Sequence, residues 1–226
     1  MLFTYLGHAC FTITSNNKTI LVDPFISGNP LAQQIDIDQI QADYILLSHG
    51  HADHVADVER IAIHTGALII CAYEIHEWLH QKGITHTHPM NTGGAHTFGP
   101  FHIKCTVAQH SSCLPDGTYA GNPMGFLIKT EEKSVYYSGD TALTMDMKLI
   151  PHWAKLDAAI LPVGDNFTMG YEDACLAAQF CEAKRVIGVH FDTFPPIRIN
   201  HETATQHFAQ ADIQLHLPSI EQSIHI

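Results

Sequence analysis

The chain has 226 residues, of which 46% are hydrophobic and 15% are charged, a composition that excludes a disordered protein. Eleven lysines and arginines against 23 acidic residues give a net charge of −12, which disfavours nucleic acid and anionic membranes as partners. The longest apolar runs, such as residues 67–73, are far shorter than a membrane span, and no signal peptide is recognisable. We therefore expect a cytoplasmic protein that acts on a small molecule; its oligomeric state stays open, a homo-oligomer included.

The pattern of apolar residues predicts short strands and a few helices. Strands are expected at residues 3–6, 10–14, 19–23, 43–48, 67–72, 101–107, 125–130, 134–138, 158–161 and 185–189. Helices are expected at residues 55–64, 74–81, 171–182 and 201–210, the last with Asn200 as its N-cap. Strand-rich halves that are each followed by helices, with no linker between them, predict one α/β domain over residues 1–226, a sandwich of sheets covered by helices.

The cysteines give no sign of metal binding, whereas the number of histidines does. The six cysteines are scattered without any Cys-x-x-Cys, which indicates buried free thiols. The 18 histidines outnumber the 11 lysines and arginines together, and histidine is the commonest protein ligand for metals. The histidines are therefore the first place to look for chemistry.

The densest group of ligand-type side chains follows the predicted strand 43–48. There His49, His51, Asp53 and His54 stand within six residues, and the small residues between them leave room for adjacent metals. His49 and His51 can reach one ion, while Asp53 and His54 turn towards a second. A structural zinc site would more often use cysteines, so this pattern favours a catalytic metal site.

Three further candidate ligands lie just past the ends of predicted strands. His110 follows strand 101–107, Asp140 follows strand 134–138 through a glycine turn, and His190 follows strand 185–189. Sites built on sheets are usually assembled at the carboxyl ends of strands. Asp140 is the natural bridge, because a carboxylate can give one oxygen to each of two ions.

The order of these residues resembles the metallo-β-lactamase superfamily: His-x-His-x-Asp-His, then a single His, then Gly-Asp-Thr, then a late His. The segments 5–10, 21–25 and 162–170 resemble a narrower branch of metal-dependent hydrolases, related to ascorbate-6-phosphate lactonase and N-acylphosphatidylethanolamine phospholipase D. The resemblance covers nearly the whole chain and implies a four-layer αβ/βα sandwich. It implies that the first metal is held by His49, His51 and His110, the second by Asp53, His54 and His190, and that Asp140 bridges them.

These residues predict a binuclear metal-dependent hydrolase. Two ions roughly 3.5–4 Å apart lower the pKa of a bridging water towards about 7, and the resulting hydroxide attacks a carbonyl or phosphoryl centre. We expect Asp53 to be the catalytic residue that orients the nucleophile and relays a proton, in addition to binding metal. Zinc suits a histidine and carboxylate set, with manganese or iron as alternatives. The expected substrate is a small ester, lactone or phosphodiester.

Other residues are weaker candidates. His8 and Thr168 are expected on the substrate side of the site, and Asp23 is expected to orient a metal-binding histidine through its far ring nitrogen. Loop packing or a turn explains each of these about as well. The segment 76–80 satisfies His-Glu-x-x-His, the signature of a zinc-protease helix, but no convincing third ligand follows it. We interpret it as an exposed helix face, and Cys113 as a spectator.

Two alternative functions stay open at this point. One is a metal-binding or ligand-sensing protein on the same fold that lacks turnover. The other is a nuclease-type or phospholipase-type phosphodiesterase. Hydrolysis of lactone and phosphodiester panels that a chelator abolishes would separate an enzyme from a sensor.

Overall fold

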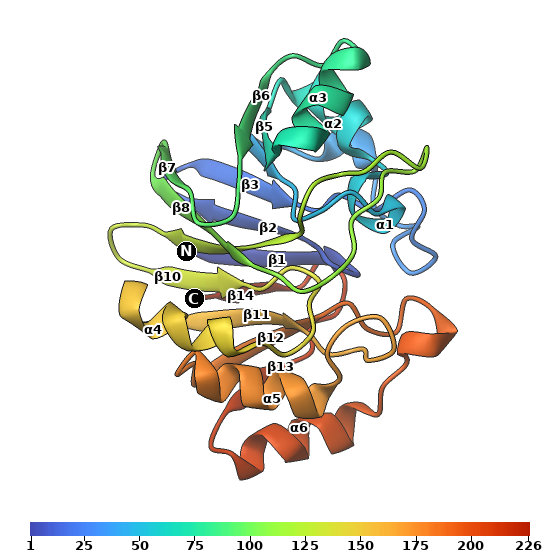
Figure 1. Cartoon of the computed structure of the whole chain (residues 1–226). Coiled ribbons are helices and arrows are strands. Elements are labelled where there is room, and N and C mark those ends of the chain that lie inside the picture. Colours follow the sequence, from blue (N-terminus) through green and yellow to red (C-terminus); the bar gives the residue numbers. More distant parts are fainter.

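Two seven-stranded sheets form the centre of the molecule (Figure 1). The structure is a computed structural model that describes residues 1–226. In the first sheet the order is β14 (Ser223–His225), β1 (Leu2–Gly7), β2 (Cys10–Ser15), β3 (Lys18–Val22), β4 (Tyr44–Leu46), β5 (Leu68–Ala72) and β6 (Thr87–Met90). In the second sheet the order is β13 (Gln214–His216), β12 (Arg185–Val189), β11 (Ala158–Pro162), β10 (Ser134–Tyr137), β9 (Met124–Lys129), β8 (Phe101–Val107) and β7 (Ala95–Phe98).

Each sheet joins an antiparallel half to a parallel half. The strands β3 to β6 are parallel in the first sheet, and β10 to β13 are parallel in the second. The carboxyl ends of parallel strands share one edge, so the loops that follow β3, β4, β10, β11 and β12 gather at one end of the sandwich, on the right in Figure 1. The candidate ligands come from these loops and, for His110, from the loop after β8, a strand that runs in the same direction as β10.

Helices cover the outer face of each sheet. On the first sheet lie α2 (Val58–Thr65) and α3 (Tyr73–Gln81), and on the second lie α4 (Ile150–Trp153), α5 (Tyr171–Phe180) and α6 (His201–Gln210). Short 3-10 turns occur at Ile37–Gln39, Met145–Leu149 and Pro195–Ile197. The predicted four-layer αβ/βα sandwich is confirmed.

The sequence pattern explains why the strands take these places. In β8 the side chains of Phe101, Ile103 and Cys105 are buried while His102 is exposed, as the alternation predicts. Every residue of β11 is buried, because the second sheet is covered on both faces there. The core contains 64 buried hydrophobic residues and extends through both sheets. All cysteines except the exposed Cys113 are buried, and none forms a disulfide.

One predicted helix is wrong in its extent. Residues 55–64 were expected as a single helix, but the structure divides this region into α1 (Ala52–Val55) and α2. The break falls at Asp57, whose carboxylate accepts hydrogen bonds from the backbone N–H groups of Ile26 and Ser27 and from the Ser27 hydroxyl. These tertiary bonds tie the chain to the loop after β3 and leave α1 short, with its residues directed to the site.

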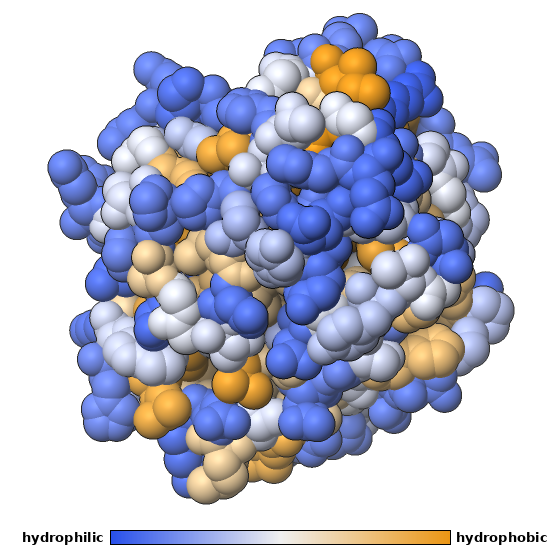
Figure 2. Space-filling model, turned by 45° about the horizontal axis from the view of Figure 1, so that its top comes forward, coloured by the Kyte–Doolittle hydropathy of each residue, from blue (hydrophilic) through white to orange (hydrophobic).

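The molecule presents a mainly hydrophilic surface on the face drawn in Figure 2, where hydrophobic residues show as separate small patches. Of the large apolar side chains that are exposed, Ile63, Tyr73 and Phe167 come from different elements. Met145, Leu149 and Trp153 lie together along the 3-10 turn Met145–Leu149 and α4. None of the helices combines the length and the apolar character that crossing a bilayer requires.

Candidate metal centre

The loop after β4 brings His49 and His51 together. Gly50 between them has no side chain, and a Cβ there would clash with Ala120. The loop therefore packs closely against the segment around Ala120. His51 is the N-cap residue of α1, so the same turn that starts this helix also places Asp53 and His54 on its first turn.

The first group of candidate ligands comprises His49, His51 and His110, whose ligand atoms lie within 4.8 Å of one another. Nε2 of His49 is 2.9 Å from Nδ1 of His51. Burial lowers the pKa of all three and holds that of His49 well below its usual value. Neutral imidazoles have a free nitrogen lone pair, which is the form that binds metal.

The second group comprises His8, Asp53, His54 and His190, again with ligand atoms within 4.8 Å. The predicted set of Asp53, His54 and His190 is therefore brought together, and the structure adds His8 to it. His54 and His190 are buried, while the Asp53 side chain is 29% exposed. Asp53 is thus the member of this group that solvent or a substrate can reach.

His8 lies behind Asp53 and does not face the pocket. Its Nε2 is 3.1 Å from Oδ2 of Asp53, and its Nδ1 is 3.0 Å from Oγ1 of Thr193. Burial and the neighbouring His190 lower the pKa of His8 to about 4, so the ring is neutral at pH 7. Its Nε2–H then donates to the carboxylate, and its Nδ1 accepts from the Thr193 hydroxyl. The expectation that His8 contacts substrate is thereby corrected: with its side chain fully buried, it supports Asp53 instead.

Asp140 lies between the two groups. Its Oδ2 is 3.1 Å from Nε2 of His190, 3.2 Å from Nε2 of His54 and 3.8 Å from Nε2 of His110. Burial would raise its pKa, but His190 and His54 hold the pKa well below its usual value. Gly139, with a φ of +64°, makes the turn that swings this carboxylate inward. An ionised carboxylate in this central position suits a bridging ligand.

Asp23 anchors two of the histidines from behind. Its Oδ2 accepts hydrogen bonds from Nδ1 of His54 at 3.0 Å, from the Ser48 hydroxyl at 2.6 Å and from the Tyr137 hydroxyl at 2.7 Å. Because the Ser48 hydroxyl donates to Asp23, it accepts from Nδ1 of His49 at 2.9 Å. Both rings therefore present Nε2 to the site, which is how outer hydrogen bonds orient metal-binding histidines.

His54 is held between two carboxylates. Burial alone would lower its pKa, but Asp140 and Asp23 outweigh that effect and raise the pKa well above its usual value. The ring is therefore protonated at pH 7 while no metal is bound.

A pocket of about 440 Å³ opens above these side chains. Its floor includes His51, Asp53, Asp140 and other predicted ligands. Thr168 was expected to face it, but the Thr168 hydroxyl donates to the carbonyl of Met169 and the side chain lies outside the wall. Its neighbour Phe167 is on the wall instead. The sequence could point to this loop but not to the residue that enters the pocket, because that depends on the turn at the loop's tip.

The His-Glu-x-x-His segment does not form a comparable cluster. It lies on α3, where the rings of His76 and His80 stand 4.0 Å apart and both bond to the Thr87 hydroxyl. No third histidine, cysteine or carboxylate joins them in a ligand group. The geometry agrees with the interpretation of this segment as a helix face.

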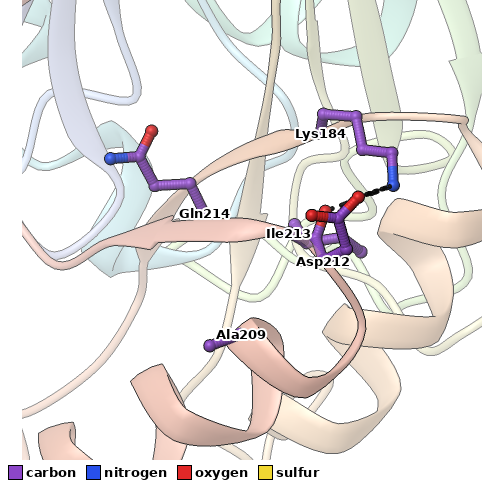
Figure 3. A pocket seen from close by; sticks show the side chains of 5 residues that line it. All are labelled: Lys184, Ala209, Asp212, Ile213 and Gln214. Atoms are coloured by element: carbon purple, nitrogen blue, oxygen red, sulfur yellow. Dashed lines mark hydrogen bonds and ion pairs between the residues drawn. The ribbon is translucent and has the colours of Figure 1, made fainter.

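A second surface depression, drawn in Figure 3, also lacks a ligand group. It lies around Lys184, Asp212 and Gln214, at the amino end of β12, whereas His190 follows the carboxyl end of that strand. Its charged groups satisfy each other, since Nζ of Lys184 is 2.9 Å from Oδ2 of Asp212. The chemistry-bearing residues are thus confined to the other end of the sandwich.

Two observations show that the residues of the site suit metal ions. Nδ1 of His190 is buried without a hydrogen-bond partner, and Nε2 of His54 has only the Asp140 carboxylate at 3.2 Å, outside hydrogen-bond geometry. Unsatisfied buried polar atoms are few in folded proteins. Imidazole nitrogens and carboxylate oxygens are also the donor set that zinc and neighbouring transition metals accept. The donors that metal ions require are therefore in place.

Comparisons with known proteins agree with this geometry. Residues 18–191 match the β-lactamase superfamily domain. A UPF0173 metal-dependent hydrolase from Flavobacterium johnsoniae is 51% identical over 226 residues, and one from Christiangramia forsetii is 47% identical over 227, each covering 100% of both chains. A metallo hydrolase from the archaeon Ignicoccus hospitalis has a TM-score of 0.89 at 31% identity and covers 99% of this chain and 97% of its own.

The fold and the histidine and aspartate site define a protein of the metallo-β-lactamase superfamily. Within it, the chain belongs to the UPF0173 family of metal-dependent hydrolases.

Proposed function

We propose that this metal-dependent hydrolase is binuclear, that it uses zinc, and that it cleaves a small ester, lactone or phosphodiester. One observation carries the proposal. A third ligand group, His49, His54 and Asp140, shares His49 with the first group and His54 with the second. Two adjoining groups linked in this way support a pair of neighbouring ions at the floor of the pocket.

The ligands would be His49, His51 and His110 for one ion and Asp53, His54 and His190 for the other, with Asp140 between them. Divalent ions held there supply the positive charge that polarises the scissile bond and lowers the pKa of water. Asp23 keeps the rings of His49 and His54 in the orientation that binding requires. These residues hold the site, and the substrate enters from the open side of the pocket.

Asp53 is the proposed proton carrier. Burial would raise its pKa, but the hydrogen bond from His8 and the charge of His54 together outweigh this and lower the pKa below its usual range, so the carboxylate is ionised at pH 7. With Oδ2 occupied by His8, Oδ1 would serve both roles: one lone pair would bind the metal, and the other would accept a proton from the attacking water and pass it to the leaving group. The partial exposure of this side chain supports the proposed role, because solvent and a substrate can reach the carboxylate.

The proposed partner is a small molecule alone. The pocket is of the size that takes small ligands, about 300–1,000 Å³ in general. The net charge of −12 disfavours long polyanions and anionic membranes. Nucleic acid and lipid bilayers are therefore left out of the proposal.

Metal analysis coupled to a hydrolysis panel tests the proposed function. Purified protein should contain about two zinc ions per chain, and it should hydrolyse at least one of a set of chromogenic esters, lactones and phosphodiesters with saturation. A chelator should abolish turnover, and added zinc should restore it. Metal-replete protein that binds these compounds without turning any of them over would favour a sensor instead. One ion per chain with full activity would overturn the binuclear site.

A further inference from the structure

Apart from Ser111, the walls of the metal-site pocket are apolar, and they carry no positive charge. Beyond the metal-binding side chains, the wall consists of Ser111, Phe167, Phe194 and Pro196. No lysine or arginine is among the lining residues. Arg198, two residues beyond Pro196, is exposed and lies outside the lining. A ligand group that contacts these walls therefore meets the rings of Phe167 and Phe194 and no positively charged lysine or arginine.

Phe167 is held in place although its side chain is 55% exposed. It stands at the tip of a tight turn, preceded by Asp165 and Asn166 with φ values of 63° and 58°. The base of the turn is closed by a bridge between Gly164 and Gly170. A phenyl ring presented beside a pocket offers apolar surface that a ligand can cover, and covering that surface is favourable.

The same turn is tied to the metal site. The N–H of Met169 donates to the carbonyl of Thr141 at 3.1 Å, and Thr141 directly follows the central ligand Asp140. The position of Phe167 is therefore fixed relative to the ligands, as a residue that sets specificity requires.

Phe194 is supported from behind. Its ring centroid is 5.4 Å from that of His8 in an edge-on arrangement and 6.3 Å from that of Phe25. The 3-10 turn that follows, Pro195–Ile197, adds Pro196 to the wall, and two prolines limit the freedom of this backbone. The second aromatic wall is thus also built on a rigid support.

The charges around the pocket disfavour a ligand that carries a second negative charge away from the metal-binding floor. Its lining contains the carboxylates of Asp53 and Asp140, and the protein as a whole carries −12. Bound metal ions can neutralise an anionic group at the floor, but a second charge remote from the floor would have no partner on the walls.

We propose that the substrate carries an uncharged apolar group of about the size of one aromatic ring next to the bond that is cleaved, and that this group packs against Phe167 and Phe194. The inference rests on the proposed function and narrows its substrate class. It favours neutral aryl or similarly bulky apolar esters and lactones over phosphate-bearing or dicarboxylate compounds.

Binding of small hydroxamic acids tests the inference without requiring turnover. Hydroxamates chelate active-site metals, so phenylacetohydroxamic, acetohydroxamic and succinic monohydroxamic acids differ only in the group that reaches the walls. In zinc-loaded protein of measured metal content, isothermal titration calorimetry should show the phenyl compound binding about tenfold more tightly than the acetyl compound, because an apolar ring is buried. The succinic compound, which carries a second charge, should gain nothing.

Single-residue variants test whether Phe167 and Phe194 cause the tighter binding of the phenyl compound. Phe167→Ala should remove most of the advantage of the phenyl compound while leaving acetohydroxamic acid binding within about twofold. Tyr73→Ala is the matched control, because Tyr73 is also aromatic, is 54% exposed and lies outside the pocket. Phe194→Leu should reduce the advantage with less disturbance of the ring packing than Phe194→Ala. Arg198→Ala should change none of the three affinities.

The results of these binding experiments distinguish a failure of the aromatic subsite from a failure of the proposed hydrolase activity. Equal binding of the three compounds, tighter binding of the succinic compound, or a phenyl preference that survives in Phe167→Ala would overturn the inference while hydrolysis stands. A phenyl preference lost in Phe167→Ala, in protein that hydrolyses nothing, would support the aromatic subsite and overturn the hydrolase. Failure of all three compounds to bind metal-replete protein would overturn the inference as well.

Discussion

A single carboxylate, that of Asp53, combines metal binding with proton transfer in the proposed mechanism, and the two roles can be separated. Asp53→Asn keeps the side chain's size and one oxygen that can bind metal, but it removes the charge and the ability to take a proton. We expect kcat to fall roughly 10²–10⁴-fold, the usual contribution of general acid–base catalysis, in protein that still holds metal. Steady-state kinetics on metal-analysed protein measures this effect.

The control for this variant is Asp146→Asn, since Asp146 is an exposed acid at the other face of the second sheet, in the turn before α4. It should leave kcat unchanged. A metal-replete Asp53→Asn protein with kcat close to that of the parent would reduce Asp53 to a ligand and remove it from proton transfer.

Metal binding should depend on pH through His54. Asp140 and Asp23 raise the pKa of His54 well above its usual value, so the metal-free protein carries a proton there at pH 7. A metal ion that takes Nε2 must displace that proton. The apparent metal affinity should therefore rise with pH until the pKa of His54 is passed, and binding at pH 7 should release a proton.

Calorimetry of zinc binding in two buffers with different ionisation enthalpies counts the released protons. Asp23→Asn removes one of the two carboxylates and lowers the pKa of His54, so fewer protons should be released at pH 7 than from the parent or from Asp146→Asn. An equal count in the parent and Asp23→Asn would show that His54 is not the group that loses the proton.

The sequence allowed the ligand set to be proposed because ligand positions follow strand ends. His49, Asp140 and His190 follow β4, β10 and β12, and the parallel strands bring these ends together. The places of His8 and Phe167 could not be inferred in the same way. Which side of a loop a side chain takes depends on left-handed backbone turns and on contacts with distant segments, such as the 3.0 Å contact between His8 and Thr193.

At the scale of elements, α3 provides a test of whether context or motif decides metal binding. Its His-Glu-x-x-His segment has two histidines one turn apart but no third ligand, and both rings are engaged with Thr87. Replacing His76 and His80 together by alanine should leave the metal content near that of the parent, while His51→Ala should lower it. Elemental analysis of the dialysed proteins decides: metal lost from the double variant and retained by His51→Ala would reverse the assignment.

The central strands and the longer helices were predictable, and the four edge strands were not. The strands β8 and β12 were predicted with the bounds that the structure gives, and α6 begins after Asn200, whose side chain caps it through the N–H of Thr203. The strands β6, β7, β13 and β14 were not predicted. They have three or four residues at or next to sheet edges, which is too short for an alternating pattern, and β6 contains Pro89.

At the scale of the whole molecule, the net negative charge repels anions, whereas metal ions bound at the site would attract them. The chain carries −12, whereas metal ions at the floor of the pocket add local positive charge. At low ionic strength the acidic surface acts over more than about 10 Å and repels a long polyanion, while a small anion can reach the metals.

We therefore expect polymers and bilayers to be poor competitors for the site. With metal-loaded protein and a chromogenic small substrate such as bis-p-nitrophenyl phosphate, added tRNA, single-stranded DNA or anionic vesicles should leave the rate unchanged at low salt, because the negative surface keeps them from the pocket. A small anion such as inorganic phosphate is the positive control and should inhibit. Inhibition or cleavage at micromolar polymer or lipid that disappears when salt is added would show a functional polyanion site, and the protein would then belong with nucleases or phospholipases in its choice of substrate.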